Sequence, residues 1–341
     1  MLEPYRNHVG RRRILAIAGG ACYNPVTTQG RWRKVIATYC LNPCLDKTVE
    51  VRTLKKGGLN RIASSRTDPG GKGINVARAL KTLDVETRAV CALPEKGSEE
   101  FLSLLSAEKL SVDSVTTPGV IRTNLKVHAL EDGEITELNE SGVPLSSHAT
   151  EVIWEKVRMY RTQAEMHVLS GSLPPKASPA TYYNLISELA SAPVFLDASG
   201  EALLEGIKAK PMFVKPNRLE MEYVAGRELS HLEDIRSAAE KWVTLGIRYV
   251  CVSLGSEGAM LATDAGCWYA PAMEVEANST VGAGDAMVAG LILGWKKSEK
   301  AEDILRYGVA AASASCLTTG TQMLRKADFE AFLQRCEVRC L

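Results

Sequence analysis

The chain has little excess charge of either sign and no long apolar run. Its 341 residues include 41 lysines and arginines and 40 acidic residues, which gives a formal net charge of +1. A near-neutral chain has no global field that would indicate nucleic acid or an anionic membrane as a partner. No apolar run approaches the ~20 residues that a membrane-spanning helix needs. We therefore expect a globular protein that binds neither nucleic acid nor a membrane.

The sequence also lacks the cysteine spacings of a zinc site or a disulfide framework. It has nine cysteines, an odd number, and none of them form a C-x-x-C pattern. Most lie in apolar surroundings, which is typical of reduced, buried thiols in a cytoplasmic protein. Cys336 and Cys340 could pair under oxidation, but we expect them to belong to a fraying tail.

Several catalytic signatures are missing as well. There is no H-E-x-x-H zinc motif, no G-x-S-x-G elbow, and neither H-R-D nor D-F-G of the protein kinases. The Walker A spacing and the G-x-G-x-x-G dinucleotide fingerprint are also absent. The missing fingerprint disfavours a nicotinamide-dependent oxidoreductase, which would otherwise be a reasonable alternative for an α/β protein.

The first 34 residues differ in composition from the rest of the chain. They contain seven basic residues and a single acid, Glu3. The apolar run at residues 14–21 follows three arginines, as in a signal peptide, but it is short and includes two glycines. We expect a disordered extension over residues 1–34 and a folded domain over residues 35–335.

Within the expected domain, strand and helix patterns alternate. Residues 34–41 are β-branched and apolar and predict the first strand, and residues 74–83 have apolar side chains at helical spacing. From about residue 148, leucine-rich helices alternate with β-rich runs, which predicts an α/β fold with a parallel sheet covered by helices on both faces. Antiparallel pieces at about 44–68 and 120–140 predict a smaller sheet outside it. The first of these pieces is expected to end at Asp68-Pro69-Gly70-Gly71.

The most informative motif is the segment over residues 279–285. Its Gly282-Ala283-Gly284 turn precedes an apolar helix, so N–H groups would point outward at the positive end of the helix dipole. That arrangement predicts an anion site. Asp285 inside such a site could take a proton from a hydroxyl that attacks a phosphoryl group. The alternative is a simple strand-to-helix turn in which Asp285 is the N-cap.

Other polar motifs also follow predicted strands, where ligands bind in open α/β sheets. The Gly70-Gly71-Lys72-Gly73 turn would let backbone approach a ligand, and Lys72 could balance a phosphate charge. Asp46 could accept hydrogen bonds from sugar hydroxyls, or cap a turn. Arg122, with Lys126 nearby, offers donors that suit a phosphate, or is a solvated surface charge.

Three further segments, at residues 170–175, 215–220 and 253–258, end other predicted strands. Asn217 and Glu220 share one face of a helix start and could orient phosphate oxygens, water and Mg²⁺. They could equally form a capping box. The small residues of the last segment would admit a nucleotide base or ribose.

Together these motifs resemble a known family. Residues 70–77 and 279–285 resemble the two signatures of the PfkB (ribokinase-like) sugar kinases, and residues 217–220 match their N-x-x-E motif. The resemblance covers about residues 35–335. Two features depart from the family pattern: Cys44 stands where alanine or serine is usual, and residues 92–97 lack a glycine pair. Six segments look most like the 1-phosphofructokinase branch: residues 41–51, 68–80, 135–142, 169–175, 214–229 and 252–260.

The resemblance implies a ribokinase-like three-layer α/β/α sandwich with a mostly parallel central sheet and a small β-sheet lid. It also implies transfer of a phosphoryl group from ATP, with Mg²⁺, to D-fructose 1-phosphate by a cytoplasmic enzyme that forms a homodimer. Tagatose-6-phosphate kinase or a minor-type 6-phosphofructokinase is the alternative, and an inactive sugar-phosphate-binding sensor is a lesser one.

The resemblance assigns a role to each site residue. Asp285 would be the general base, with the N–H groups of Gly282, Ala283 and Gly284 on the transferred phosphoryl group. The substrate would contact Asp46, Gly70, Gly71, Lys72, Asn75, Arg122, Lys126 and Ser170. The nucleotide would contact Ser253, Leu254, Gly255, Ser256, Glu257, Gly258, Lys215, Asn217, Gly284 and Asp285. Asn217 and Glu220 would lie near Mg²⁺, through water or phosphate.

Overall fold

The structure, a computed structural model, describes residues 35–341 apart from residues 190, 191 and 277. The chain divides into two units, Met1–Trp32 and Arg33–Leu341, and all described residues belong to the second. The expected disordered extension over residues 1–34 lies outside the described residues.

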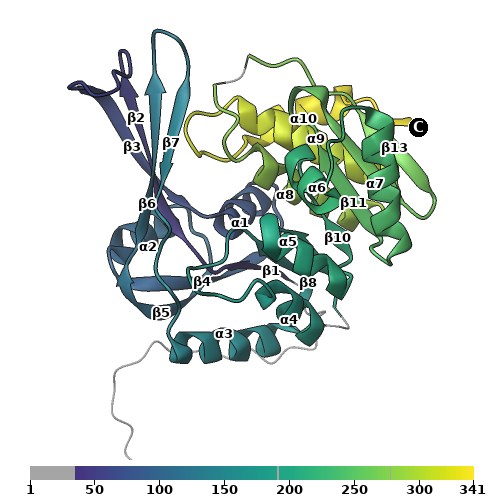
Figure 1. Ribbon diagram of the computed structural model, residues 1–341, viewed down its shortest axis with the longest axis horizontal. Helices are drawn as coiled ribbons and strands as arrows, with labels where there is room; N and C mark the ends of the chain where they lie inside the picture. The colour runs from purple at the N-terminus through teal and green to yellow at the C-terminus, as the bar shows by residue number, and fades with distance from the viewer. Residues whose placement is uncertain (1–34, 190–191, 277) are drawn as a thin grey trace, which may run out of the picture. The chain divides into compact units, whose positions relative to one another are not determined.

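A ten-stranded sheet forms the centre of the described unit (Figure 1). Seven of its strands run parallel, and three antiparallel strands extend it at one edge, because a hairpin follows the last parallel strand. The parallel strands are, in spatial order, β5 (Val112–Val120), β4 (Thr87–Lys96), β1 (Val35–Cys40), β8 (Ala164–Ser170), β9 (Val194–Asp197), β10 (Phe213–Val214) and β11 (Tyr249–Ser253). The antiparallel strands are β12 (Ala259–Thr263), β13 (Gly266–Ala270) and β14 (Arg339–Cys340).

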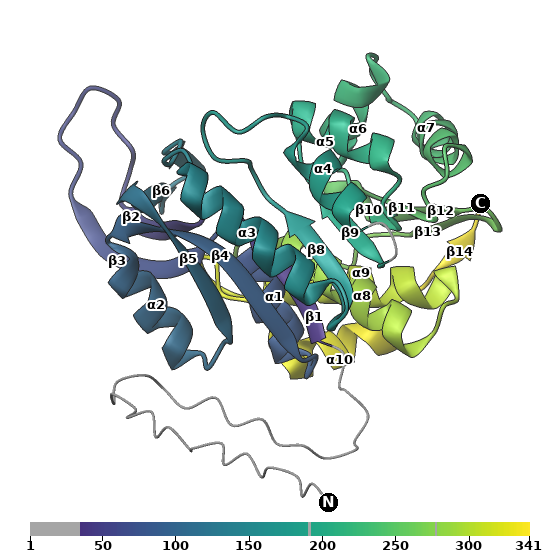
Figure 2. The same ribbon diagram turned by 90° about the horizontal axis from the view of Figure 1, so that it is seen from below.

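Helices cover both faces of this sheet, as Figure 2 shows. Neighbouring residues of a strand point to opposite faces, so Ala37 belongs to one apolar core and Ile36 to the other. The first core includes α3 (Ser147–Tyr160), α4 (Thr181–Glu188), α5 (Gly200–Gly206), α6 (Arg218–Ala225) and α7 (Leu232–Thr244). The other face carries α1 (Lys72–Thr82), α2 (Ser98–Ala107), α8 (Ala283–Lys297), α9 (Ala301–Cys316) and α10 (Lys326–Arg335). The predicted three-layer α/β/α sandwich is confirmed. Among the described helices, none is long and apolar enough to cross a membrane.

Four strands form a second sheet beside the layers. Its order is β3 (Ile62–Gly70), β2 (Cys44–Val51), β6 (Arg122–Ala129) and β7 (Ile135–Asn139). The predicted end at Asp68 is wrong, because β3 continues through Pro69 to Gly70, which pairs with Cys44. The strand can continue because β3 is an edge strand, where a proline without an N–H group is tolerated.

The cysteines of the described ranges are all free. Six of them are buried: Cys40, Cys44, Cys91, Cys251, Cys267 and Cys336. The expected fraying of the tail is wrong. Cys340 lies in β14, which pairs with β13, and the N–H of Leu341 donates to the carbonyl oxygen of Cys267 at 2.9 Å.

Candidate active site

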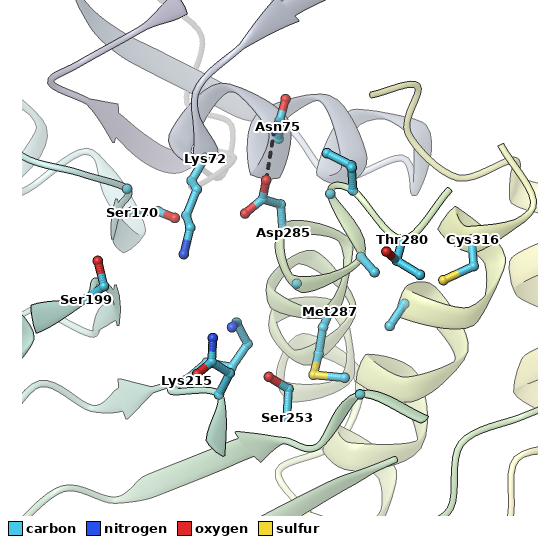
Figure 3. A pocket seen from close by; sticks show the side chains of 18 of the residues that line it. Lys72, Asn75, Ser170, Ser199, Lys215, Ser253, Thr280, Asp285, Met287 and Cys316 are labelled. Carbon is cyan, nitrogen blue, oxygen red and sulfur yellow. Dashed lines mark hydrogen bonds between the residues drawn. The ribbon is translucent and has the colours of Figure 1, made fainter. Parts of the chain in front are cut away.

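A cavity of about 1070 Å³ lies at the carboxyl ends of the central strands (Figure 3). Its lining includes residues that end or follow β1, β8, β10 and β11, together with the starts of α1 and α8 and parts of β6 and β7. Pockets for a single small ligand are typically ~300–1,000 Å³. The cavity is therefore large enough to hold two ligands side by side.

The start of α8 forms one wall. Gly282 is the N-cap with a φ of 83°, a left-handed conformation that favours glycine, and no side chain caps the helix. The alternative of Asp285 as the N-cap is therefore wrong; Asp285 lies within the first turn instead. The N–H of Ala283 donates to the carbonyl oxygen of Thr280 at 3.3 Å, so one donor of the predicted anion site is already used. The N–H groups of Gly284 and Asp285 belong to the first turn, which has no acceptors within the helix.

Asp285 is only 5% exposed, and it faces α1. The Nδ2 of Asn75 donates to its Oδ2 at 2.8 Å. Burial raises the pKa of Asp285 from its ordinary value of 3.8 to about 6, against the opposing influence of the Lys72 ammonium. A carboxylate with this pKa is ionised at neutral pH and still accepts a proton readily, which suits a general base.

A second buried carboxylate, Asp197 at the end of β9, was missed in the sequence. Its Oδ1 lies 3.4 Å from the Nζ of Lys72 and 3.3 Å from the Nζ of Lys215, and its Oδ2 accepts a hydrogen bond from Ser170 at 3.1 Å. Burial alone would raise the pKa of Asp197, but the two ammonium groups outweigh it and hold the pKa below 3.8. Asp197 in turn raises the pKa of Lys72. The available signal was a single carboxylate at the end of an apolar strand.

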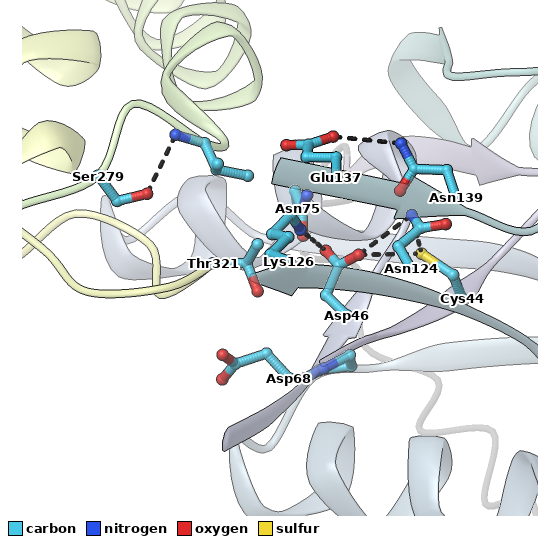
Figure 4. Close-up of polar contacts among 12 residues, drawn as sticks. Cys44, Asp46, Asp68, Asn75, Asn124, Lys126, Glu137, Asn139, Ser279 and Thr321 are labelled. Carbon is cyan, nitrogen blue, oxygen red and sulfur yellow. Dashed lines mark hydrogen bonds and ion pairs between the residues drawn. The ribbon is translucent and has the colours of Figure 1, made fainter. Parts of the chain in front are cut away.

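The second sheet contributes Asp46 and Lys126 to the lining of the cavity, and Figure 4 shows their polar contacts. The Nζ of Lys126 lies 3.1 Å from Asp46 Oδ2, and both side chains are buried. Asn124 Nδ2 donates to Asp46 Oδ1 at 3.2 Å, and the Cys44 thiol donates to the same oxygen at 3.4 Å. Gly70 does not line the cavity, but a Cβ on it would lie 2.5 Å from Asp46 Oδ2. A side chain at position 70 would thus displace Asp46.

Arg122 lines the cavity, but its guanidinium is already bonded. Its Nε and Nη2 donate to the carbonyl oxygen of Asn42 at 3.2 and 2.9 Å. Its Nη1 donates to Asn124 Oδ1 and to the carbonyl oxygen of Glu140, at 3.0 and 3.1 Å. A substrate phosphate would have to compete with these contacts.

Asn217 and Glu220 also line the cavity, and they form the capping box of α6. The N–H of Glu220 donates to Asn217 Oδ1, and the N–H of Asn217 donates to Glu220 Oε2, both at 2.8 Å. Among the described residues, no group of three or more His, Cys, Asp or Glu side chains could hold a metal ion. A divalent cation at this place would need ligand oxygens and water as further ligands.

The remaining end of the cavity is more apolar. Of the predicted nucleotide residues, Ser253, Gly255, Ser256 and Gly258 line it, whereas Leu254 is buried and Glu257 pairs with Arg218 at 2.8 Å. Residues 273–275 and four residues of α9 also line the cavity, and no sequence motif indicated them. The latter repeat at helical spacing on one face, a signal that could have revealed them: Val309, Ala312, Ser313 and Cys316.

Comparison with known proteins identifies the family. Residues 40–327, which are most of the chain, match the family described as "pfkB family carbohydrate kinase". The chain belongs to the pfkB family. This pfkB protein is therefore a phosphotransferase that acts on a sugar hydroxyl, and the predicted family is confirmed.

Two curated relatives of this pfkB kinase have different substrates in their names. The 1-phosphofructokinase of Escherichia coli (strain K12) is 34% identical over 306 residues, which are 89% of this chain and 98% of the relative. The ATP-dependent 6-phosphofructokinase isozyme 2 of the same strain is 34% identical over 307 residues, 88% of this chain and 99% of the relative. The structure of E. coli phosphofructokinase-2 in complex with substrates and products has a TM-score of 0.84 at 32% identity, covering 89% of this chain and 99% of that chain. Overall identity alone therefore does not separate the two sugar phosphates.

Proposed function

We propose that this pfkB kinase phosphorylates D-fructose 1-phosphate with ATP to give fructose 1,6-bisphosphate. The observation that carries the proposal is the buried Asp285, held by Asn75 at a helix N-terminus beside two lysines. Relatives named 1-phosphofructokinase in E. coli and in Bacillus subtilis, the latter 33% identical over 287 residues, support the choice of sugar phosphate.

Asp285 acts as the general base in this proposal. Asn75 holds Oδ2, which leaves Oδ1 free to face the acceptor hydroxyl of the sugar. The hydroxyl gives its proton to Asp285 as its oxygen attacks, and a positioned base of this kind typically contributes ~10²–10⁴-fold. Asn75 Oδ1 is buried and has no hydrogen-bond partner among the described residues, so it could accept a bond from a second sugar hydroxyl once its surroundings open toward the ligand.

The charged groups around Asp285 would hold the phosphate oxygens. Gly284 and the turn before it supply backbone N–H groups, and Lys72 and Lys215 can exchange Asp197 for ligand oxygens. ATP supplies the transferred phosphoryl group, and Mg²⁺ would neutralise part of its charge near Asn217 and Glu220. The apolar side of the cavity, along α9, would receive the adenine ring of ATP.

The second sheet would hold the sugar phosphate. Asp46, Gly71 and Ser170 line the cavity where sugar hydroxyls would lie, and Lys72, Arg122 and Lys126 supply positive charge for the existing phosphate. Strands β6 and β7 form part of the wall, so movement of this sheet would exclude water. This is the lid role that we propose for it.

Replacing the proposed base tests the mechanism. We expect Asp285→Asn to bind ATP and the sugar phosphate but to have a kcat lower by at least ~100-fold, since a carboxamide cannot take the proton from the hydroxyl. Asp264→Asn, at an exposed turn, is the control. A near-normal kcat in Asp285→Asn would remove it from the base role.

A kinase for either alternative substrate would use the same proposed catalytic residues, so these residues do not identify the sugar phosphate. Fructose 6-phosphate is favoured by one observation, the 34% identity to the 6-phosphofructokinase isozyme. ADP release should be measured with fructose 1-phosphate, fructose 6-phosphate and tagatose 6-phosphate at equal concentrations. We expect the highest kcat/KM with fructose 1-phosphate, and a higher value with another sugar phosphate would replace it as the substrate. Undetectable turnover with all three would favour a sugar-phosphate sensor.

A homodimer formed through the second sheet is a further part of the proposal. Leu59, Ile62 and Leu138, on or beside its edge strands, are 78%, 58% and 58% exposed, and such apolar exposure is typical of an interface. A solved structure of E. coli phosphofructokinase-2 is described as a tetrameric inhibited form, so sedimentation should be measured with and without ATP.

The free thiols of the described residues support a cytoplasmic location as part of the proposal.

A further inference from the structure

Arg78 is a buried cation that does not line the active-site cavity. It lies on α1, one turn after Asn75, and is 5% exposed. Its Nη1 donates to the carbonyl oxygens of Pro69 and Thr321, at 3.2 and 3.0 Å. Its Nε and Nη2 donate to the two carboxylate oxygens of Glu108, at 2.7 and 2.6 Å. One guanidinium therefore joins α1 to β3, to the segment that follows α9, and to the end of α2.

The Pro69 carbonyl belongs to the sugar side of the site. Pro69 directly precedes Gly70, against which Asp46 packs, and Gly71 and Lys72 follow at the start of α1. By holding this carbonyl, Arg78 fixes the last residues of β3 against the helix that carries Lys72 and Asn75.

The Thr321 carbonyl belongs to a loop that supports the turn before α8. In this loop, residues 317–325, the carbonyl oxygen of Leu317 accepts a bond from Asn278 Nδ2 at 2.9 Å. The carbonyl of Cys316, where the loop begins, accepts bonds from the N–H groups of Asn278 and Ser279. The Cε of Met323 lies 3.2 Å from the place of a Cβ on Gly282. The loop thus holds the turn from which α8 and Asp285 start.

We propose that Arg78 is a positioning residue that sets the distance between the sugar-binding turn at Gly70–Gly71 and the base-carrying turn at Gly282. It acts through the Asn75–Asp285 contact and touches neither ligand. The proposal rests on the role of Asp285 as the base. Glu108 orients the guanidinium, and the two backbone carbonyls are the groups that it positions.

Arginine is suited to this task and lysine is not. Its planar fork presents donors in several fixed directions, whereas a lysine ammonium is one compact charge on a flexible four-carbon stem. Arg78→Lys keeps the positive charge but cannot bond two carbonyls and a carboxylate at the same geometry. A misplacement of ~1 Å in an active site can cost about 100-fold in rate.

A second cavity gives access to Arg78 from outside. It has a volume of about 720 Å³, and its lining includes Arg78, Glu108 and Gln322. A guanidinium ion in solution could therefore enter the space left by Arg78→Ala and bond to the same groups.

The experiment measures kcat, ATP affinity and Tm for Arg78→Lys and Arg78→Ala in the full chain. We expect Arg78→Lys to lower kcat about 10- to 100-fold with little change in the Kd of ATP. We expect guanidinium chloride at millimolar concentration to restore part of the kcat of Arg78→Ala. Arg306→Ala is the matched control, because Arg306 also joins carboxylates to a backbone carbonyl, that of Cys336, away from both turns. Its kcat should stay near that of the unchanged chain.

A double-variant measurement separates positioning from a general loss of stability. If Arg78 acts through the base, Arg78→Lys should cause no further loss of kcat when Asp285→Asn is already present. An equal loss in that background, a kcat within twofold of the unchanged chain, or an equal loss in Arg306→Ala would overturn the proposal. If Arg78→Ala does not fold, the result for Arg78→Lys decides. Near-normal turnover in Asp285→Asn alone would instead remove Asp285 from the base role on which this proposal rests, whatever Arg78→Lys does.

Discussion

The burial of Asp285 gives the carboxylate a pKa that suits a general base, but it also lowers the stability of the folded protein at neutral and alkaline pH. Its pKa is raised from 3.8 to about 6 in the folded protein, so the folded state binds this proton more tightly than the unfolded chain. A raised pKa favours folding below the unfolded pKa, and that contribution is lost as the pH rises through about 6. At pH 8 the ionised, buried carboxylate therefore destabilises the fold by about 3 kcal/mol, from ~1.4 kcal/mol for each pKa unit.

We expect Asp285→Asn to raise Tm at pH 8 and to have a smaller effect at pH 4.5. The amide removes the cost of a buried charge, and that charge is largely absent in acid. Thermal unfolding at the two pH values checks this, with Asp264→Asn as an exposed control. A Tm that is unchanged at pH 8 would contradict the raised pKa.

The same pKa sets the acid limit of activity. The base must be ionised to accept a proton, so kcat/KM should fall tenfold per pH unit as the pH decreases below about 6. The measurement is kcat/KM between about pH 4 and 8, because this ratio reports the pKa of the free enzyme. An acid limb near pH 4 would mean that the carboxylate is better solvated than in this structure.

At the scale of elements, α8 and α9 approach each other so closely that their packing fixes the position of Asp285. A Cβ on Gly290 of α8 would lie 2.3 Å from the carbonyl oxygen of Tyr307 in α9, and a Cβ on Gly308 would lie 2.7 Å from Leu291 Cδ2. The backbones thus touch where most helix pairs are separated by side chains. Since Asp285 is on the first turn of α8, any displacement of α8 also moves the base.

We expect Gly290→Ala to destabilise the protein by about 1–3 kcal/mol, because the new methyl group has no space and α8 must shift. The variant should also lose kcat, although Gly290 itself does not line the cavity. Urea unfolding and steady-state kinetics measure the two effects. Gly58→Ala, in an exposed segment where the nearest atoms belong to the Lys55 side chain and carbonyl, is the matched control. Equal stability of the two variants would contradict the close approach.

At the scale of the whole molecule, the cavity joins the two sheets through shared wall residues. A ligand that binds only the folded form stabilises it by about 2.7 kcal/mol at 100 times its Kd. We expect fructose 1-phosphate to raise Tm by several degrees at a concentration where fructose 6-phosphate raises it less. Thermal-shift measurements with equal concentrations of the two, and fructose as control, need no turnover. A larger shift with fructose 6-phosphate would favour the alternative substrate.

The parts that the sequence predicts are those with local causes. The alternation of strands and helices predicts the layers, and the Gly282-Ala283-Gly284 turn predicts the start of α8, because both depend on near neighbours. Asp197 was not predicted as a site residue because its role depends on its ion pair with Lys72, which is 125 residues away in the sequence. The competing bonds of Arg122 and the bridging role of Arg78 were missed for the same reason: their partners are brought together only by the fold. Asn217 and Glu220 could be interpreted as a capping box or as residues near Mg²⁺. The capping box depends only on residues close in the sequence, whereas a role near Mg²⁺ depends on a ligand and on distant residues.

The free cysteines provide a ready measure of opening. Cys340 is exposed and should react with a thiol reagent at once, whereas the six buried thiols lie in both sheets and near the end of α10, so each reacts only when its own region opens. Cys316, of intermediate exposure, borders the proposed nucleotide site and should be shielded by ATP. Locating the labelled cysteines by peptide mass against time would therefore show which layer of the unmodified protein opens first, with no introduced probe.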